Sequence, residues 1–264
     1  MPTVLPTTKH PTKLFNCHCF DLFKRIPDQS IDLVLTDPPY GTTACKWDSI
    51  IPLEPMWEQL KRVIKSNGVV AMTASQPFTS ILVTSNIKMY KHEWIWIKNR
   101  GSNFANTVRE PMKEHESVLI FSNGKWIYNK QMQERTGGGR DLIGKTVGTG
   151  QEQRKGVGNF KEFKPIKSLN KLRVPSTWQK FNTEVGLHPT QKPILLMEYL
   201  IKTYTNEDET VLDFAMGSGT TGVACKSLNR LFIGCDIDIE NGYFEIARDR
   251  IKYAPPSNLP NNPQ

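Results

Sequence analysis

Short apolar blocks alternate along the chain with stretches in which apolar residues recur every three or four positions. The first pattern predicts buried strands and the second predicts amphipathic helices. The expected strands are Lys13–Cys17, Ile31–Thr36, Val69–Thr73, Trp94–Lys98, Ser117–Phe121, Thr210–Phe214 and Leu231–Asp236, with a hairpin turn at Ser122–Gly124 leading into Lys125–Asn129. The expected helices, beside a short one after the first strand, are Leu53–Lys65, Pro77–Asn86, Pro193–Tyr204, Thr221–Leu228 and Tyr243–Ile251. Strands that alternate with helices indicate an α/β fold with an open, mostly parallel sheet.

The regular pattern is interrupted between residues 131 and 185. Eight of the 18 glycines lie in this segment, and the apolar periodicity is lost. Such a composition is typical of an inserted, loop-rich module. We therefore expect one α/β domain in two halves, residues 11–130 and 186–253, with the insert between them and a disordered tail at residues 254–264.

The net charge of +8 is concentrated in one part of the chain. Between Lys125 and Lys180 there are 13 Lys or Arg and four Asp or Glu, so this segment has a net charge of +9 and the remainder has −1. Basic residues interleaved with aromatic ones favour contact with a nucleic-acid backbone, although a solvated basic loop is the alternative. The candidate phosphate contacts are Arg154, Lys155, Lys161 and Lys164.

The composition argues against several other classes of protein. No run of apolar residues approaches 18, and the first ten residues lack the apolar core of a signal peptide, so a cytoplasmic protein is expected. The five cysteines form no CxxC pair and suggest no disulfide framework. No metal site is expected at Cys17-His18-Cys19, because adjacent residues of a strand point to opposite faces.

The segment from Val211 to Gly222 predicts a strand, a tight glycine turn and the start of a helix. Glycines permit positive φ, and the helix start offers unpaired N–H groups to a ligand. Asp236 follows Gly217 by nineteen residues, at the end of the next strand, where a carboxylate holds ribose hydroxyls. A nicotinamide dinucleotide and S-adenosylmethionine both fit this pattern. Asp213 favours the second, because a carboxylate attracts the amino group of a methionine moiety and repels a pyrophosphate.

Asp37-Pro38-Pro39-Tyr40 follows a buried strand and therefore lies at the carboxyl edge of the sheet, where open α/β folds bind ligands. The prolines leave backbone carbonyls without local partners. The exocyclic amine of a base is a poor nucleophile because its lone pair is delocalised into the ring. Hydrogen bonds accepted by the Asp37 carboxylate and the Pro38 carbonyl would free this lone pair for attack on a sulfonium methyl. Tyr40 would stack on a base swung out of a duplex.

These two segments, together with His188-Pro189-Thr190-Gln191-Lys192-Pro193 and Gly234-Cys235-Asp236-Ile237-Asp238, occur in the order typical of one enzyme family. The chain resembles the beta group of S-adenosylmethionine-dependent DNA amino-methyltransferases, in which the Asp-Pro-Pro-Tyr motif precedes the target-recognition region and the cofactor loop comes last. The resemblance runs from Leu14 to Ile251. It implies a Rossmann-like methyltransferase domain with circularly permuted motif order and a mixed sheet ending in an antiparallel hairpin, which the Ser117–Asn129 region suits.

The resemblance also assigns roles to individual residues. It implies that Asp37, Pro38, Pro39 and Tyr40 are catalytic, that Asp236 holds the ribose of S-adenosylmethionine, and that Lys192 lies near the cofactor carboxylate. The remaining cofactor-lining residues would be Asp213, Phe214, Gly217, Ser218, Gly219 and Thr220. His18 departs from the family, because it stands where most members carry an acidic residue that binds the cofactor adenine. A neutral imidazole can donate or accept one hydrogen bond there.

The activity implied by the resemblance is methylation of N6 of adenine in duplex DNA, with a cognate restriction endonuclease and a second copy of the chain as candidate partners. Cytosine-N4 methylation uses the same displacement, but members that perform it more often begin the motif with Ser. An RNA adenine methyltransferase would use the basic insert equally well. Cytosine carbon-5 chemistry needs a cysteine nucleophile, typically after proline, and no cysteine here follows one. A nicotinamide-dependent dehydrogenase leaves the Asp37–Tyr40 corner unexplained, and a non-catalytic DNA-binding module leaves the glycine turn unexplained.

Overall fold

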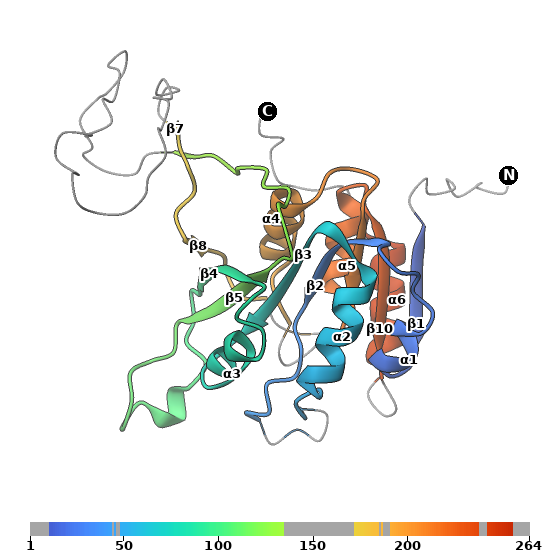
Figure 1. Cartoon of the computed structure of the whole chain (residues 1–264). Helices are drawn as coiled ribbons and strands as arrows, with labels where there is room; N and C mark the ends of the chain where they lie inside the picture. The colour runs from blue at the N-terminus through green and yellow to red at the C-terminus, as the bar shows by residue number, and fades with distance from the viewer. Residues whose placement is uncertain are drawn as a thin grey trace, which may run out of the picture. The chain divides into compact units, whose positions relative to one another are not determined.

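The computed structural model describes residues 11–43, 45, 48–134, 172–184, 186, 191–237 and 242–255. The chain divides into two units, one made of Met1–Asn129 and Thr177–Asn261 and the other of Lys130–Ser176 and Asn262–Gln264. The larger unit contains the α/β fold (Figure 1). In the smaller unit the described residues form a two-stranded antiparallel sheet of β6 (Gln133–Glu134) and β7 (Leu172–Arg173).

Eight strands of the larger unit form one sheet in the order β1-β10-β9-β2-β3-β5-β4-β8. Strand β5 pairs antiparallel with β3 and β4, and every other described pair in this sheet is parallel. The expected α/β fold with a mostly parallel sheet is therefore confirmed. The strands are β1 (Thr12–Asn16), β2 (Ile31–Thr36), β3 (Ile64–Ala74), β4 (Tyr90–Ile97), β5 (His115–Phe121), β8 (Trp178–Lys180), β9 (Thr210–Asp213) and β10 (Leu231–Asp236).

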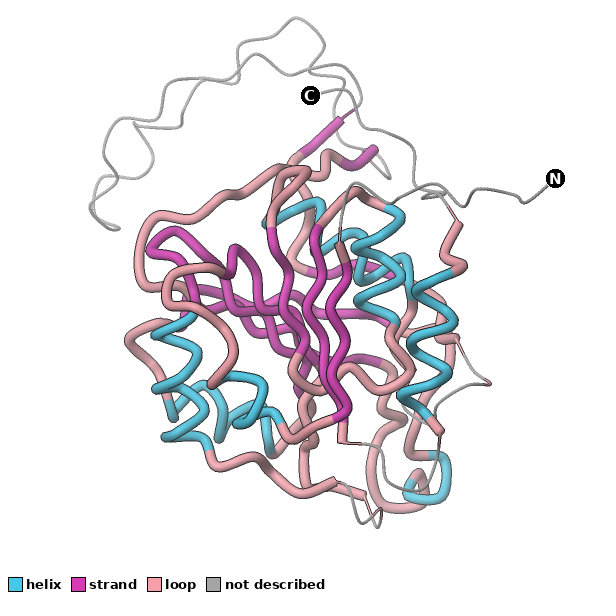
Figure 2. The backbone as a smooth tube through the Cα atoms, turned by 90° about the vertical axis from the view of Figure 1, so that its right-hand side faces the viewer, coloured by secondary structure: helices cyan, strands magenta, loops and turns pink. Residues whose placement is uncertain are grey.

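Helices cover both faces of this sheet, as the view along its edge shows (Figure 2). Helices α1 (Cys19–Phe23), α2 (Leu53–Val63) and α3 (Phe78–Ser85) contribute to one hydrophobic cluster, and α4 (Ile194–Tyr204), α5 (Thr220–Ser227) and α6 (Tyr243–Lys252) contribute to the other. Strand β2 contributes to both clusters: Val34 belongs to the first, and Leu33 and Leu35 belong to the second. A strand buried on both faces needs a continuous apolar run, which explains why the sequence pattern located β2 so well.

Two expectations about the far side of the sheet were wrong. Lys125–Asn129 is not a strand; the Asn129 backbone N–H donates instead to the Thr203 carbonyl at the end of α4, at 2.8 Å. The antiparallel hairpin is formed by β4 and β5, and residues 98–114, which include the 3₁₀ helix η1 (Phe104–Asn106), connect these strands. Strand β8 was not expected, and it pairs in parallel with β4 from Ile95↔Trp178 to Ile97↔Lys180. The larger unit includes residues 177–184, whereas the composition of the sequence predicts an insert that runs to residue 185.

The strand order reverses between β9 and β2. From β2 the sheet continues to β3 on one side, and from β9 it continues to β10 and β1 on the other. Open α/β sheets bind ligands outside the carboxyl ends of the strands at such a switch point. Because β5 is antiparallel, its amino-terminal end lies at this same edge. Among the described helices, none has the length and hydropathy of a membrane span.

Candidate active site

Asp37 is the first residue after β2 and lies at the switch point, with its side chain 22% exposed. Oδ1 of its carboxylate accepts a hydrogen bond from the Tyr40 hydroxyl at 2.7 Å and another from the Thr73 hydroxyl near the end of β3. Oδ2 accepts from the Lys192 ammonium at 2.6 Å. Three donors from three segments therefore fix the carboxylate, while no described residue donates to the carbonyl of Pro38.

Tyr40 is held by its ring as well as by its hydroxyl. Its ring stacks on Phe78 with a centroid distance of 5.3 Å and an interplanar angle of 19°, and the Lys192 ammonium lies 5.7 Å from the ring centroid. Burial, followed by the nearby carboxylates of Asp37 and Glu116, raises the pKa of Tyr40 well above its usual value. Tyr40 is consequently a neutral hydrogen-bond donor with a fixed ring.

Lys192 belongs to a buried chain of alternating charges. Its side chain is 7% exposed, and besides Asp37 it contacts Glu116 Oε2 at 3.5 Å. Glu116 Oε1 in turn contacts the ammonium of Lys98, which follows β4. Burial disfavours the charged form of Lys192, but Asp37 and Glu116 outweigh this effect and raise its pKa. The two ammonium and two carboxylate groups together carry no net charge, which makes their burial tolerable.

The loop after Tyr40 is organised by a second carboxylate, Asp48. Its Oδ1 accepts from the Gly41 backbone N–H at 2.9 Å, and its Oδ2 accepts from those of Thr42 and Thr43 at 2.9 and 2.7 Å. Burial alone would raise the pKa of Asp48, but these hydrogen bonds, with one from the Thr43 hydroxyl, lower it. Gly41 has φ +68°, a conformation that side chains disfavour. The backbone leaving the Asp37–Tyr40 corner is therefore held in one conformation.

Asp213 ends β9, next to the end of β2, and is 3% exposed. Its Oδ1 accepts from the Thr36 hydroxyl at 2.7 Å and from the Ala215 backbone N–H at 3.1 Å. Burial raises the pKa of Asp213 to about 7, although these hydrogen bonds and one from Thr221 oppose the shift. A buried carboxylate of this kind stabilises a cation that comes beside it.

The glycine turn joins β9 to α5 as expected. Gly217 and Gly219 both have positive φ, +49° and +79°, and a Cβ on Gly219 would lie 2.8 Å from the Ala247 Cβ. The Gly217 backbone N–H donates to Asp236 Oδ2 at 2.6 Å, so the end of β10 fixes the turn. Arg250 of α6 donates to both the carbonyl and the hydroxyl of Ser218, at 2.6 and 2.9 Å.

The other predicted cofactor residues take positions in the same turn or in the core. Thr220 begins α5, whereas the Phe214 side chain is 2% exposed and packs edge-on against Phe23 at 5.5 Å between ring centroids. His18 is exposed at the carboxyl edge, where its Nδ1 accepts from the Phe20 backbone N–H at 3.3 Å and caps α1. The described residues contain no cluster of three His, Cys, Asp or Glu side chains suited to a metal ion.

The predicted DNA contacts Arg154, Lys155, Lys161 and Lys164 lie outside the described residues. Two aromatic residues at the beginning of the basic segment have structural partners: Trp126 lies against His92 at 6.2 Å and Tyr128 against Tyr204 at 6.3 Å between ring centroids. Trp178 of β8 is 50% exposed. Exposure therefore favours Trp178, and not Trp126, as an aromatic contact for a partner.

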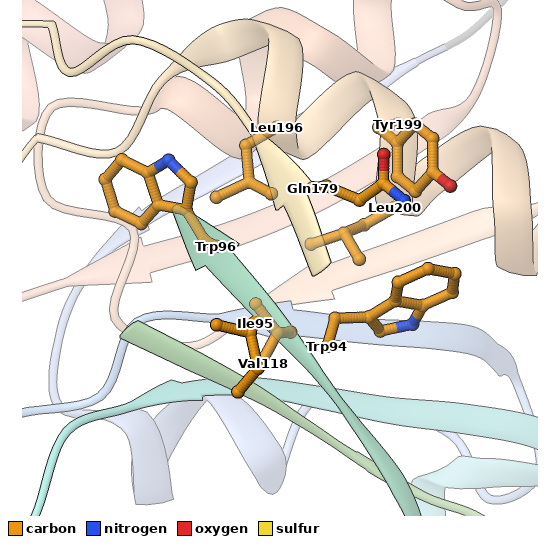
Figure 3. Close-up of a pocket in the computed structure, with 8 residues that line it drawn as sticks. All are labelled: Trp94, Ile95, Trp96, Val118, Gln179, Leu196, Tyr199 and Leu200. Atoms are coloured by element: carbon orange, nitrogen blue, oxygen red, sulfur yellow. The ribbon is translucent and has the colours of Figure 1, made fainter. Parts of the chain in front are cut away.

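A hollow in the larger unit lies between β4, β5, β8 and α4 (Figure 3). It is lined by Trp94, Ile95, Trp96, Val118, Gln179, Leu196, Tyr199 and Leu200. The space among these side chains is too small for a water molecule. It is part of the packing between the sheet and α4 and is not a candidate site.

Sequence reasoning missed six residues that shape the site. These are Thr36, Asp48, Thr73, Lys98, Glu116 and Arg250. Thr36 and Thr73 carried a weak signal, because each is a polar residue near the end of an otherwise apolar strand. Lys98 and Glu116 carried none, because they become neighbours only when β4 and β5 pair.

Comparison with known proteins identifies the fold and its family. A family model described as DNA methylase matches residues 31–249. The chain belongs to this DNA methylase family. Among curated relatives of this DNA methylase, the Type II methyltransferase M.HpaI of Haemophilus parainfluenzae is 28% identical over 262 residues, which cover 90% of this chain and 74% of the relative. The Type II methyltransferase M2.DpnII of Streptococcus pneumoniae is 28% identical over 269 residues, which cover 92% and 91%.

Solved structures show the same architecture. The complex of M1.HpyAVI with SAM is 26% identical, with a TM-score of 0.60 over 91% of this DNA methylase and 100% of that chain. The PvuII DNA methyltransferase, described as cytosine-N4-specific, has a TM-score of 0.63 at 16% identity, covering 98% and 89%. At that identity the second likeness concerns the fold alone.

Proposed function

We propose that this DNA methylase transfers a methyl group from S-adenosylmethionine to N6 of an adenine that is swung out of duplex DNA at a specific site. The observation that carries the proposal is the position of Asp37 and Pro38 at the switch point, beside Asp213 at the end of the neighbouring strand. An acceptor pair for the target amine and an acidic site for a cationic cofactor thus occupy adjacent strand ends.

The residues of the glycine turn suit the cofactor. Gly217 and Gly219 keep side chains away from the start of α5, and the buried Asp213 would be stabilised by a cationic amino group. Asp236, at the end of the next strand, supplies acceptors for ribose hydroxyls. S-adenosylmethionine supplies an electrophilic methyl group on a sulfonium when bound. The SAM complex of M1.HpyAVI supports this assignment.

The chain's own groups act on the target amine. The Asp37 carboxylate and the Pro38 carbonyl accept hydrogen bonds from its two N–H groups and draw the lone pair out of the ring. Tyr40, fixed by Phe78 and by its bond to Asp37, presents its ring to the base. Because these groups are ordered before the base arrives, they need little reorganisation during the reaction.

Adenine is favoured over cytosine by the first residue of the corner. In the family that the sequence resembles, members acting on cytosine N4 more often have Ser where this chain has Asp37. The proposal also places the protein in the cytoplasm and in a restriction–modification system, with a cognate restriction endonuclease and a second copy of this chain as candidate partners. The Type II methyltransferase relatives support the restriction–modification setting.

The test is to incubate the protein with methyl-labelled S-adenosylmethionine and DNA from cells that lack its activity, and then to identify the labelled nucleoside by mass spectrometry after digestion. Label in N6-methyldeoxyadenosine is expected. Label in N4-methyldeoxycytidine would overturn the choice of base, and label only in a parallel RNA reaction would overturn the choice of polymer. Sequencing of the methylated DNA then gives the recognition site.

A further inference from the structure

Glu116 brings to the active site an acceptor that the proposed reaction does not use. Its Oε1 contacts Lys98, but its Oε2 is buried and accepts no hydrogen bond in the described part of the chain. The Lys192 ammonium lies 3.5 Å from Oε2. A buried carboxylate oxygen that lacks a hydrogen bond is costly, so its persistence here needs a reason.

The hydrogen bonds to Asp37 suggest that reason. Each carboxylate oxygen has two lone-pair sites. Tyr40 and Thr73 both donate to Oδ1, so the target amine has to approach Oδ2, where Lys192 donates at 2.6 Å. An ammonium is a stronger donor than an aromatic amine. While Lys192 stays in this position, it occupies one of the two lone-pair sites of Oδ2 and its charge draws electron density from that oxygen, so Asp37 accepts the hydrogen bond of the target amine more weakly than it would without Lys192.

We propose that Glu116 is a positioning residue that takes over the Lys192 ammonium when the target amine reaches Asp37. This inference rests on the proposed function. The distances from Lys192 Nζ to its two carboxylate partners are 2.6 and 3.5 Å, so a shift on the order of 1 Å, well within the flexibility of a lysine, exchanges one hydrogen bond for the other. Oε2 of Glu116 would then gain the partner that it lacks.

The arrangement of charges keeps the free-energy cost of this exchange low. Lys192 stays between two carboxylates throughout, so no buried charge becomes unpaired. Lys98 holds the other oxygen of Glu116, and its own ammonium lies 5.1 Å from the ring centroid of Trp96. Glu116 therefore remains in place while Lys192 moves.

The test compares Glu116→Gln with the wild type and with Glu114→Gln as a matched control. Glu114 is an exposed carboxylate two residues away, and its substitution removes the same charge. The rate constant of methyl transfer is measured in a single turnover on the DNA site that the wild type methylates. We expect it to fall about tenfold or more in Glu116→Gln and to be unchanged in Glu114→Gln, with S-adenosylmethionine affinity unchanged in both.

A binding measurement separates this role from a merely structural one. Two duplexes are compared, one with adenine at the target position and one with purine, which lacks the amino group. Wild type should prefer adenine, and Glu116→Gln should lose much of that preference, because Lys192 stays on Asp37. A structural defect would weaken both duplexes alike. If Glu116→Gln melts below the assay temperature, the same measurements are made on Glu116→Asp. The shorter side chain of Asp withdraws the carboxylate from Lys192, so we expect a methyl-transfer rate and an adenine preference between those of wild type and a complete loss.

The outcomes are distinct. A wild-type rate and preference in Glu116→Gln would overturn the role of Glu116, as would an equal loss in Glu114→Gln. A wild-type protein that transfers no methyl group to DNA would instead refute the proposed function.

Discussion

Asp37 directly follows β2 and Asp213 ends the adjacent strand β9, yet their surroundings differ. Asp37 contacts an ammonium and two hydroxyls, whereas Asp213 is more deeply buried and its hydrogen bonds come from hydroxyl and backbone donors. Burial raises the pKa of the Asp213 carboxyl group to about 7. Different environments for two carboxylates are typical of sites in which each has its own task. Here one faces the target amine and the other faces the cofactor in the proposed reaction.

Replacement of Asp37 by Ala should remove activity without removing cofactor binding. The carboxylate acts on the amine in the transition state, so turnover should fall by about 10²- to 10⁴-fold. The dissociation constant of S-adenosylmethionine should change by less than about tenfold. Methyl transfer and calorimetric binding, measured on the same preparation, check both parts. Turnover within a few-fold of wild type would contradict the role assigned to Asp37.

The raised pKa of Asp213 predicts a pH dependence of stability. In the folded protein the Asp213 carboxyl group keeps its proton up to a pH of about 7, whereas in the unfolded chain it releases the proton near pH 3.8. The resulting stabilisation is complete below the unfolded value and is lost as the pH rises through the folded one. The unfolding free energy of wild type minus that of Asp213→Asn should therefore fall by about 2–3 kcal/mol between pH 5 and 7.5, because one pKa unit corresponds to about 1.4 kcal/mol.

Chemical denaturation of the two proteins across this pH range measures the difference. It should become flat above pH 8, where the carboxyl group is ionised in both states. A difference that is constant from pH 5 to 8.5, or that grows with pH, would show that Asp213 is ionised throughout. Comparison with Asn keeps the shape of the side chain and an oxygen that can accept from Thr36.

Elements were predictable from the sequence where burial alone determines them. Strands β2 and β10 have the bounds that the apolar pattern gave, because their residues fill the interior between two layers of helices. The prediction of a strand at Lys125–Asn129 was wrong. The aromatic residues of this segment alternate like those of a strand, but they pack against His92 and Tyr204. Strand β8 has three residues at the sheet edge and follows a segment without apolar periodicity, so no local pattern indicated it.

The loop that follows Tyr40 depends on a single acceptor. Replacement of Asp48 by Ala removes the carboxylate that accepts hydrogen bonds from the backbone N–H groups of Gly41, Thr42 and Thr43. The unfolding free energy should therefore fall by about 1–3 kcal/mol. The kcat for methyl transfer should fall as well, since this loop begins where the corner ends. Asp48→Asn keeps one oxygen and should lie between Ala and wild type. Urea denaturation and steady-state kinetics of the three proteins check the order, and an Ala variant as stable as wild type would show that the loop is fixed elsewhere.

The fold assembles the site from segments that are far apart in the sequence. Asp37 and Lys192 are separated by 155 positions, and Lys98 and Glu116 by 18. The ends of β2 and β9 could be placed together from the sequence, because parallel strands share a carboxyl edge. The chain of charges formed by Asp37, Lys192, Glu116 and Lys98 could not be predicted from the sequence. It depends on β5 running antiparallel, which brings the start of that strand to the same edge.

The uneven distribution of charge over the whole chain leads to a prediction about DNA binding. The segment from Lys125 to Lys180 has a net charge of +9, while the rest of the protein has −1. Swinging a base out of a duplex costs a few kcal/mol. Phosphate contacts are the natural source of compensating binding energy, and each contact releases counterions, so DNA affinity should fall steeply with salt concentration.

Replacement of Arg154, Lys155, Lys161 and Lys164 by Ala should make that dependence shallower. The slope of log affinity against log salt should decrease by up to about one unit for each phosphate that the variant no longer binds. S-adenosylmethionine affinity should not change, because the proposed cofactor residues lie in other segments. A matched control replaces four exposed lysines of the larger unit, namely Lys13, Lys24, Lys61 and Lys88. Apart from one arginine, it removes the same side chains and the same charge, and its slope should stay near that of wild type. DNA binding measured at several salt concentrations tests this prediction. If the two variants change the slope equally, the effect reflects net charge alone. If neither variant changes the slope, DNA docks on another surface.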